Sequence, residues 1–323
     1  MSRQAIDELK RQIPLLDYLQ AHGWTPARRL NRSRWMGLCP LHPDRKPSFL
    51  VDSDKSLFYC FGCQRGGDVI RFVELSCNVG FPQALALLHQ SRGRPSLLAA
   101  VASFYYDQLQ RHPEAIAYMR QRGVHSPEVI QHMRIGYARG GCLRSWLIDS
   151  GFPADLLRRT GLINGAGLDA YTRRIVFPLE NNLYGRSISN AAPPHRFLPG
   201  PKGGLYGWEQ VRQSQEIVLV EGLFDYAVLW QAGFRNITCS MGTHLNARQF
   251  EQLCDAHRTV YVTFDSDANG SGQHAADSLA QRLVAVGLGA RQVRLPNGHD
   301  PNSFFVGGGD TRQFRSLMEA ARP

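Results

Sequence analysis

Four residues near the N-terminus have the types and the spacing of a metal site. Cys39 and His42 are separated by two residues, seventeen residues follow, and Cys60 and Cys63 are again separated by two. Two short pairs of soft ligands with a hairpin-length spacer suit a tetrahedral zinc ion. Because four protein ligands fill the coordination shell, we expect one structural zinc ion that stabilises a small domain with little core of its own.

Aromatic and basic side chains surround this ligand pattern. Aromatic rings can stack on the bases of single-stranded nucleic acid, and cations can contact its phosphates. The candidates for such contacts are Arg34, Trp35 and Tyr59. The alternative, that aromatic residues of this segment form the core of the small domain, stays open.

A second group of residues with chemical potential consists of carboxylates in the last third of the chain. Five acids follow apolar, strand-like runs: Glu221, Asp225, Asp265, Asp267 and Asp300. The carboxyl ends of parallel strands meet at one edge of a sheet, so these acids are expected in one crevice. They would repel one another without cations, and hard oxygen ligands favour two or more Mg²⁺ or Mn²⁺ ions. Such ions can activate a hydroxyl group and neutralise a phosphoryl group.

Two other interpretations of these acids are available. The segment from Asp265 opens like an EF-hand loop, but its twelfth position is Ala276 where the loop needs Glu, and a strand-like run precedes it. The acids could also serve only as caps at the N-termini of helices, an alternative that is strongest for Asp225. No phosphate-binding P-loop motif occurs in the chain.

The elements that must position these residues follow from the spacing of apolar residues. A helical run spans Ile6 to Leu19, and helices dominate residues 97–160. Strands are expected at 174–179, 217–220, 237–240, 260–264 and 290–295, and helices at 224–232, 247–256 and 275–286. Strands that alternate with helices predict a parallel, doubly wound sheet over 215–300.

Composition sets the broad class of the protein. The 323 residues are 43% hydrophobic and 20% charged, which is typical of a globular chain and excludes wholesale disorder. The longest apolar run is shorter than the about 18 residues of a spanning helix, so we expect a soluble protein with no membrane partner. The N-terminus does not resemble a signal peptide, and the seven cysteines are an odd number, which favours a cytoplasmic protein with a metal site over a disulfide framework.

Charge is distributed unevenly along the chain. Residues 1–95 carry 14 Lys or Arg and 8 Asp or Glu, residues 96–214 carry the same numbers, and residues 215–323 carry 9 and 11. Basic surfaces attract polyanions such as nucleic acids. The acidic last third, in a protein of net charge +10, suggests carboxylates gathered for cations, although drift in surface charge explains it equally well.

Ten short segments in order resemble the bacterial DnaG-type primases, which join a CHC2 zinc-binding domain to a Toprim catalytic core. The matching segments are CPLHPDRKPSF (39–49), CFGCQRGGD (60–68), AYMRQRG (117–123), IGY (135–137), RRIVFP (173–178), LYG (205–207), EGLFD (221–225), GT (242–243), DSD (265–267) and DP (300–301). The resemblance covers nearly the whole chain, and the ordered set is far more specific than any single piece.

This resemblance implies DNA-templated synthesis of short RNA primers from NTPs by metal-dependent nucleotidyl transfer. It implies catalytic roles for Glu221, Asp265 and Asp267, and a magnesium site formed by these three with Asp225 and Asp300. It also implies a basic groove for the phosphates of a single-stranded DNA template and of the nucleotides. That groove is formed by Arg173, Arg174, Arg186, Arg196 and Lys202. The zinc domain would select the initiation site on the template.

The sequence departs from the family pattern at several positions. Asn302 stands where another Asp is usual, which would weaken an outer metal ligand, and Arg196 stands where Lys is usual. Ser266 replaces a common Gly, and the loop after Asp267 is longer. The helicase-interaction domain of full-length relatives is missing, so the candidate partners are a replicative helicase or replication proteins of a mobile element.

The predicted architecture is an α+β multidomain chain. A zinc-ribbon-like domain occupies 1–95, a basic helical and mixed α+β subdomain 96–214, a Toprim α/β parallel-sheet domain 215–310, and a helical tail 311–323. Two alternative functions stay open: a Toprim metal-dependent nuclease, and a single-stranded DNA-binding replication module with a weakened active site, for which Asn302 is the main support.

Overall fold

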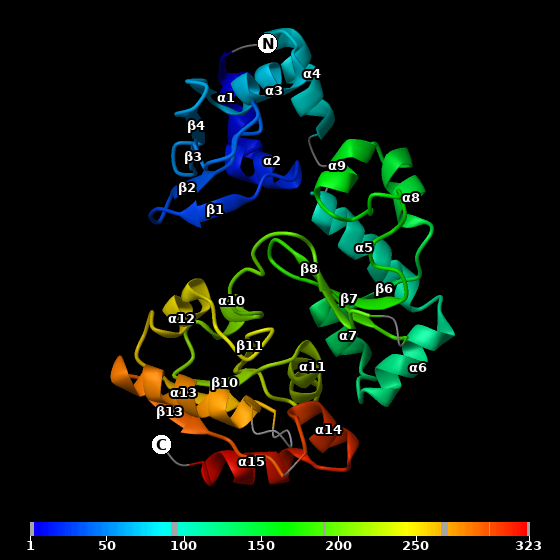
Figure 1. The fold of residues 1–323 in the computed structure, drawn as a ribbon, viewed down its shortest axis with the longest axis vertical. Coiled ribbons are helices and arrows are strands. Elements are labelled where there is room, and N and C mark those ends of the chain that lie inside the picture. Colours follow the sequence, from blue (N-terminus) through cyan, green and yellow to red (C-terminus); the bar gives the residue numbers. More distant parts are fainter. Residues whose placement is uncertain (1–2, 92–95, 190–191, 266–270, 297, 322–323) are drawn as a thin grey trace. The chain divides into compact units, whose positions relative to one another are not determined.

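The fold is taken from a computed structural model, which describes residues 3–91, 96–189, 192–265, 271–296 and 298–321. The chain forms two compact units (Figure 1). The first unit comprises residues 1–101 and 143–168, and the second comprises residues 102–142 and 169–323. The division into four parts that is expected from the sequence stays a prediction.

The first unit is built on an antiparallel sheet in the order β1-β2-β3-β4-β5. Its strands are β1 (Pro26–Arg29), β2 (Arg34–Gly37), β3 (Phe49–Asp52), β4 (Leu57–Cys60) and β5 (Gly66–Gly67). Phe49 on β3 and Phe58 on β4 are buried on one face and stack with ring centroids 5.1 Å apart. The alternation of buried and exposed residues along β4 therefore gives the sheet one core face and one solvent face.

Helices cover the core face of this sheet. They are α1 (Arg3–Gln12), α2 (Leu15–Ala21), α3 (Val69–Cys77) and α4 (Phe81–Ser91). The later segment of the unit forms two further helices, α8 (Leu143–Asp149) and α9 (Ala154–Arg159). Asp68 caps α3 by accepting from the backbone N–H groups of Ile70 and Arg71. The apolar run from Ile6 to Leu19 is not one helix. It breaks at Pro14, because proline lacks an N–H and disfavours a helical residue before it.

The second unit begins with a smaller antiparallel sheet in the order β6-β7-β8-β9. Its strands are β6 (Gly136–Ala138), β7 (Arg174–Pro178), β8 (Leu183–Ser187) and β9 (His195–Phe197), and its helices are α5 (Leu97–Leu109), α6 (Pro113–Gln121) and α7 (Pro127–Met133). A Cβ atom at Gly136 would lie 2.5 Å from the carbonyl carbon of Tyr105, so β6 contacts the backbone of α5 directly. This contact joins the helices to the basic strands.

A parallel sheet in the order β11-β10-β12-β13 forms the rest of the second unit. Its strands are β10 (Glu216–Val220), β11 (Ile237–Cys239), β12 (Thr259–Thr263) and β13 (Gly289–Gln292). The helices are α10 (Trp208–Val211), α11 (Leu223–Gln231), α12 (Ala247–Leu253), α13 (Ser271–Ala285), α14 (Pro301–Val306) and α15 (Thr311–Glu319).

Helices cover both faces of the parallel sheet, because alternate residues of its strands join two separate cores. Val218 and Val220 of β10 pack with residues of α11, α14 and α15. Ile217 and Leu219 of the same strand pack with residues of α12 and α13, which are yellow to orange in Figure 1. The expected doubly wound sheet is thus confirmed, and its strands end at a common edge. Among the described residues, no helix combines the length and the apolar character that crossing a membrane requires.

The contact at Gly136 provides a test of the fold. Gly136→Ala is expected to lower the free energy of unfolding by about 1–3 kcal/mol, because the added methyl group meets backbone atoms of α5 that cannot move aside. Urea denaturation measures this change. Gly165→Ala is the control, since a Cβ atom there meets no atom within 4 Å. Equal stability of the two variants would contradict the packing described.

Candidate metal centres and nucleic-acid interface

The four expected zinc ligands meet in the first unit. Cys39 and His42 lie in the loop after β2, Cys60 ends β4, and Cys63 lies in the turn that follows. One ligand atom from each side chain lies within 4.8 Å of all the others. Cys39 Sγ is 4.0 Å from Cys63 Sγ, and Cys60 Sγ is 4.0 Å from His42 Nδ1. Zinc–sulfur bonds of about 2.3 Å require similar separations in a tetrahedron, so the donor set fits one zinc ion.

Hydrogen bonds around the cluster orient its ligands. Asp44 Oδ2 accepts from Cys39 N at 2.9 Å and from Ser48 Oγ at 2.6 Å, and these two bonds hold the pKa of Asp44 at about 2. Ser48 Oγ also lies 3.3 Å from Cys60 Sγ. A Cβ atom at Gly62 would lie 2.9 Å from His42 Nε2, so only glycine leaves room for the imidazole ring. The chain therefore supplies an outer shell for the metal site.

Burial affects the protonation of the cluster. Burial, and to a smaller extent the neighbouring thiols of Cys60 and Cys63, raise the pKa of Cys39 to about 12. A metal ion must displace this proton, because zinc binds the thiolate. We therefore expect zinc binding to release protons and to weaken in acid.

The three expected nucleic-acid contacts of this unit occupy different places. Tyr59 lies on the solvent face of β4, 43% exposed, with its ring 5.2 Å from the exposed ring of Phe61. Arg34 is exposed at the start of β2 and pairs with Asp52 at 3.2 Å. Trp35 instead lies beside Val51 in the sheet and packs against the core, which agrees with the structural alternative for this residue. A nucleic-acid role for each of the three stays a prediction.

A basic hairpin on the same sheet is a further candidate that was not expected from the sequence. Arg28, Arg29 and Arg32 are exposed in and after β1, and the guanidinium of Arg29 lies 4.8 Å from the centre of the Trp35 ring. Trp35 thus supports a cation on the hairpin from its core position. The signal was present in the segment RRLNRSR at 28–34, which has four arginines in seven residues.

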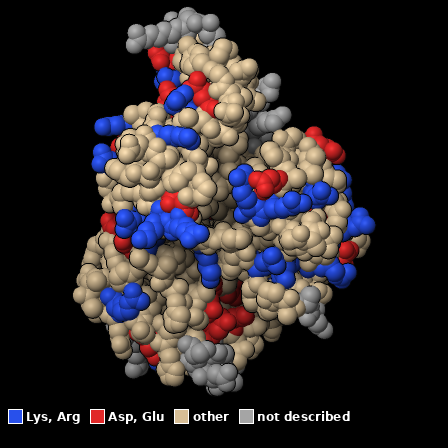
Figure 2. Space-filling model, turned by 45° about the horizontal axis from the view of Figure 1, so that its top comes forward, with Lys and Arg blue, Asp and Glu red and all other residues tan. Residues whose placement is uncertain are grey.

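The expected acids gather at the carboxyl edge of the parallel sheet. Glu221 follows β10 directly, Asp265 lies two residues after β12, and Asp300 precedes α14. Asp267 lies outside the described residues. Figure 2 shows a group of Asp and Glu side chains in a hollow of the face that it presents, with Lys and Arg side chains near its edge. The topology therefore brings the described acids together, as the strand order predicts.

Asp225 is the most deeply placed of these acids. It is 4% exposed, and its two carboxylate oxygens accept from Gly222 N and Asn302 N, each at 2.9 Å. Burial, followed by the charges of Asp300 and Asp265, raises the pKa of Asp225 well above its usual value. Asp225 therefore ties the loop after β10 to the start of α14, and the proximity of three like charges favours bound cations.

Helix capping accounts for part of the acid pattern. Asp225 occupies the first turn of α11 and accepts from Gly222 N, and Asp300 caps α14 by accepting from Ser303 N at 2.5 Å. The capping alternative raised for Asp225 is thus seen in the structure. Glu221 itself is not the cap of α11, because Gly222 occupies that position.

Asn302 makes two hydrogen bonds in a buried position, while the weakened metal ligand expected there stays a prediction. It is 2% exposed, and its Nδ2 donates to the carbonyl oxygen of Arg122 at 2.5 Å. Its backbone N–H holds Asp225. A carboxylate here would face the carbonyl oxygen of Arg122 without a proton to donate, so an amide suits this position better than an acid.

Cys239 is a site residue that the sequence analysis missed. Its thiol is fully buried at the end of β11 and donates to the carbonyl oxygen of Glu221 at 3.2 Å. Burial raises the pKa of Cys239 well above its usual value, so the group remains a hydrogen-bond donor. Gly242 N donates to the same carbonyl at 3.2 Å. These contacts fix the backbone that carries Glu221, and no sequence motif reveals them.

The basic residues expected in the groove divide into buried and accessible ones. Arg173 is exposed at the start of β7, and Arg196 on β9 lies 5.8 Å from the centre of the Tyr171 ring. Arg174 is only 5% exposed and donates to the carbonyl oxygen of Pro193 at 2.7 Å. Burial, then the charge of Arg196, lowers its pKa. Arg174 therefore supports the fold of the basic sheet in addition to any phosphate contact.

Arg186 belongs to a compact basic cluster. Its guanidinium lies 2.8 Å from His195 Nε2 and donates to Tyr118 Oη at 3.3 Å. Burial, then the charges of Arg186 and Arg122, lowers the pKa of His195. Arg122, whose guanidinium lies 4.9 Å from the centre of the Phe224 ring, is thus part of this cluster. Arg122 belongs to the segment AYMRQRG at 117–123 but was not among the basic residues expected in the groove.

Known protein families match the zinc domain, the basic region and the parallel-sheet domain in turn. Family models match a CHC2 zinc finger over residues 1–96, the N-terminal domain of a DNA primase catalytic core over 104–192, and a Toprim-like domain over 218–305. A DNA primase of Aquifex aeolicus is 30% identical over 93% of this chain. The chain belongs to the DnaG-type primase family.

Two solved structures of the primase family resemble this fold. The zinc-binding and RNA polymerase domains of the Aquifex aeolicus primase match with a TM-score of 0.62 at 28% identity, covering 100% of this chain and 86% of that chain. A DnaG primase catalytic domain bound to single-stranded DNA matches with a TM-score of 0.59 at 26% identity, covering 70% of this chain and 80% of that chain. The chain spans 66% of the Aquifex aeolicus relative's length and 60% of that of a Staphylococcus epidermidis DNA primase.

Removal of zinc is expected to unfold the first unit of this primase-family chain. Chelation, or Cys60→Ser, should abolish the melting transition of this unit and lower bound zinc from one ion per chain to none, because the metal contributes directly to its folding. Metal analysis and calorimetry measure the two effects. Cys77→Ser is the control, since Cys77 is exposed on α3 and lies outside the cluster. An unchanged transition after chelation would contradict a structural zinc ion.

Replacing the Asn302 amide by a carboxylate is expected to destabilise this protein. Asn302→Asp should lower the free energy of unfolding by about 2–3 kcal/mol, because a donor to Arg122 becomes an acceptor and a charge is added beside Asp225. Asn164→Asp is the control, since the Asn164 side chain only accepts hydrogen bonds, which Asp can replace. Thermal denaturation compares the variants. A more stable Asn302→Asp protein would show that position 302 needs a carboxylate.

Proposed function

We propose that this chain carries out DNA-templated synthesis of short RNA primers from NTPs. The observation that carries the proposal is the meeting of two opposite charge groups in the second unit. Carboxylates gather at the carboxyl edge of the parallel sheet, and Asn302 joins Asp225 of this group to the backbone of Arg122. Burial and the charges of Arg186, Arg122 and Lys202 together lower the pKa of His195, so these cations lie in one basic cluster. Lys202 Nζ donates to the carbonyl oxygen of Met241 at 3.4 Å, one residue before the Gly242 N–H that binds the Glu221 carbonyl.

The acids are the candidate ligands of two or more Mg²⁺ or Mn²⁺ ions. The ions would be held by Glu221, Asp265, Asp267 and Asp300. Besides burial, the charges of Asp300 and Asp265 raise the pKa of Asp225, and this repulsion supports the binding of cations there. Bound ions would neutralise phosphoryl oxygens and stabilise departing pyrophosphate. Asp225 would orient the two acid-bearing loops, since both of its oxygens accept from backbone N–H groups.

The chain's own residues would then perform the transfer as follows. Lys202, Arg186 and Arg122 would bind the triphosphate and align its α-phosphate with the 3′-hydroxyl of the growing primer. Glu221 is the candidate for taking the proton of that hydroxyl, because its backbone is fixed by Cys239 and Gly242. Arg173 and Arg196 would contact the phosphates of the template.

The first unit would bind single-stranded template. Tyr59 and Phe61 present exposed rings on one face of the ribbon, and the hairpin 28–34 supplies four arginines. Ring stacking and phosphate contacts of this kind bind single strands with little sequence preference, so an initiation preference requires further contacts to base edges. The relative that was solved with single-stranded DNA supports a DNA template for this family member.

A templated incorporation assay tests this function. With Mg²⁺ or Mn²⁺, the protein should extend complementary RNA on single-stranded DNA, and Glu221→Gln or Asp265→Asn should reduce the rate by about a hundredfold or more, because ligands of the ions are lost. Glu251→Gln is a matched control for Glu221→Gln, since Glu251 is exposed on α12 of the same domain. Templates of varied sequence in the same assay define the initiation site.

Two outcomes would favour the other functions. Metal-dependent cleavage of DNA without NTPs, lost in the same acid variants, would indicate a nuclease. Binding of single-stranded DNA that is unaffected by loss of the acids, with no incorporation under either metal, would indicate a DNA-binding module. Full activity in the double variant Asp265→Ala and Asp267→Ala would exclude the proposed site.

A further inference from the structure

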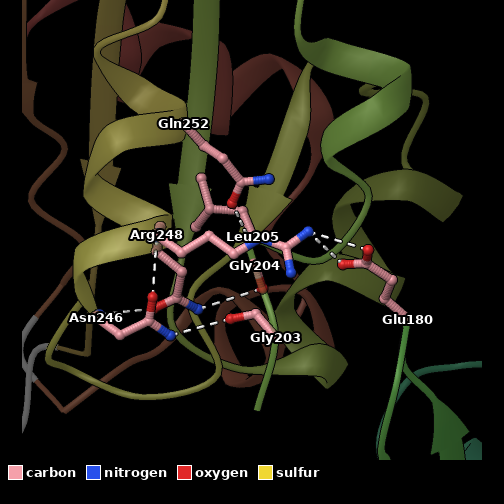
Figure 3. A network of polar contacts seen from close by, with 8 residues as sticks. Glu180, Gly203, Gly204, Leu205, Asn246, Arg248 and Gln252 are labelled. Carbon is pink, nitrogen blue, oxygen red and sulfur yellow. Dashed lines mark hydrogen bonds and ion pairs between the residues drawn. The ribbon is translucent and has the colours of Figure 1, made fainter. Parts of the chain in front are cut away.

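The segment that follows Lys202 is held by amide side chains of one helix. Asn246 Nδ2, at the N-cap of α12, donates to the carbonyl oxygen of Gly203 at 3.0 Å. Gln252 Oε1 accepts from Leu205 N at 2.7 Å. Figure 3 shows these side chains pointing from α12 toward residues 203–205. We call Asn246, Gln249 and Gln252 the amide clamp.

Gln249 is the central member of the amide clamp. It is 1% exposed, and its Nε2 donates to Ser240 O at 2.8 Å and to Gly204 O at 3.4 Å. Its Oε1 accepts from Asn246 N at 3.0 Å, which completes the cap of α12. One buried amide therefore binds the end of β11 and the segment after Lys202 at the same time.

These two attachment points lie on either side of the Lys202 contact. Ser240 precedes Met241, whose carbonyl oxygen accepts from Lys202, and Gly204 lies two residues after Lys202. Gly242, which follows Met241 in the chain, donates its N–H to the carbonyl oxygen of Glu221. The amide clamp thus sets the separation between a candidate phosphate-binding ammonium group and the loop that carries a candidate metal ligand.

The fit between the segment and the helix is tight. A Cβ atom at Gly204 would lie 2.5 Å from Gln252 Oε1, so the backbone approaches the clamp as closely as glycine permits. The Lys202 ammonium group also lies 4.6 Å from the centre of the Phe197 ring. The Lys202 side chain is therefore placed by the segment's backbone, the Met241 carbonyl and one aromatic ring.

We propose that the amide clamp, with Gln249 at its centre, positions Lys202 for the triphosphate of the incoming nucleotide. The inference deepens the proposed primase function and depends on it. Gln249 does not contact substrate and acts through Lys202, so it is a positioning residue. An amide is suited to this task because one NH₂ group donates to two carbonyl oxygens.

A neighbouring ion pair on the same helix serves as an internal comparison. Arg248 donates to both oxygens of Glu180, at 3.0 and 2.8 Å, and Figure 3 shows this pair beside the amide clamp. The two side chains are 38% and 57% exposed, so the pair contributes little to stability. No hydrogen bond of the described residues joins Arg248 to the segment 203–205.

A double-mutant cycle in the full chain tests the proposal. Gln249→Met keeps the volume but removes the donor, and it should lower kcat/KM for NTP by about tenfold. In a Lys202→Ala background, Gln249→Met should cause little further loss, because the residue through which it acts is gone. Arg248→Gln is the control and should leave kcat/KM unchanged in both backgrounds. Equal losses from Gln249→Met in the two backgrounds would overturn the proposal.

A second variant covers the case in which the buried Gln249→Met protein does not fold. Asn246→Asp keeps the acceptor that caps α12 but removes the donor to Gly203, and Asn246 is exposed. It should lower kcat/KM by a smaller factor than Gln249→Met in the wild-type background, and cause little further loss in the Lys202→Ala background. An additive loss there, or none, would contradict the amide clamp.

A chemical measurement separates this proposal from the proposed function. Lys202 is accessible to an amine-reactive reagent, and its labelling rate, followed by mass spectrometry, needs no enzymatic activity. Asn246→Asp and Gln249→Met should raise the labelling rate severalfold, whereas Arg248→Gln should not. If the wild-type protein makes no primers but the labelling changes as expected, the primase proposal fails and the positioning of Lys202 stands. Unchanged labelling in both clamp variants would refute the positioning itself.

Discussion

Repulsion between carboxylates at one edge of the parallel sheet is the constraint on which the second unit depends. Asp265 and Asp300 lie close enough to Asp225 to raise its pKa together with burial. Such a cluster is costly in a folded protein unless hydrogen bonds and cations offset it. Backbone N–H groups of Gly222 and Asn302 offset part of this repulsion by donating to Asp225. Divalent ions would offset the rest, so the edge suits them.

The supports of this edge are neutral hydrogen-bonding groups. The thiol of Cys239 and the N–H of Gly242 hold the carbonyl of Glu221, and the amide of Asn302 joins α14 to the end of α6 at Arg122. On the β11 side, Gln249 holds the segment that presents Lys202. Neutral donors therefore place the charged groups, because a buried neutral donor costs less than a buried charge of opposite sign.

The first unit uses a different physical solution. Its sheet buries only one face, on which Phe49 and Phe58 stack, and the opposite face exposes Tyr59. A zinc ion held by Cys60 and three further ligands would supply stability that this small core lacks. Rings and arginines can therefore remain exposed on the ribbon.

Features that depend on local spacing could be predicted from the sequence alone. The zinc ligands lie in two short pairs, and the parallel sheet follows from strands that alternate with helices, so both could be predicted without a structure. Only the tertiary structure decided which residues support the acids, because the contact between Asn302 and Arg122 spans 180 positions and that between Gln249 and Gly204 spans 45. No periodicity encodes such pairs. They arise where separate elements pack and buried polar groups must find partners.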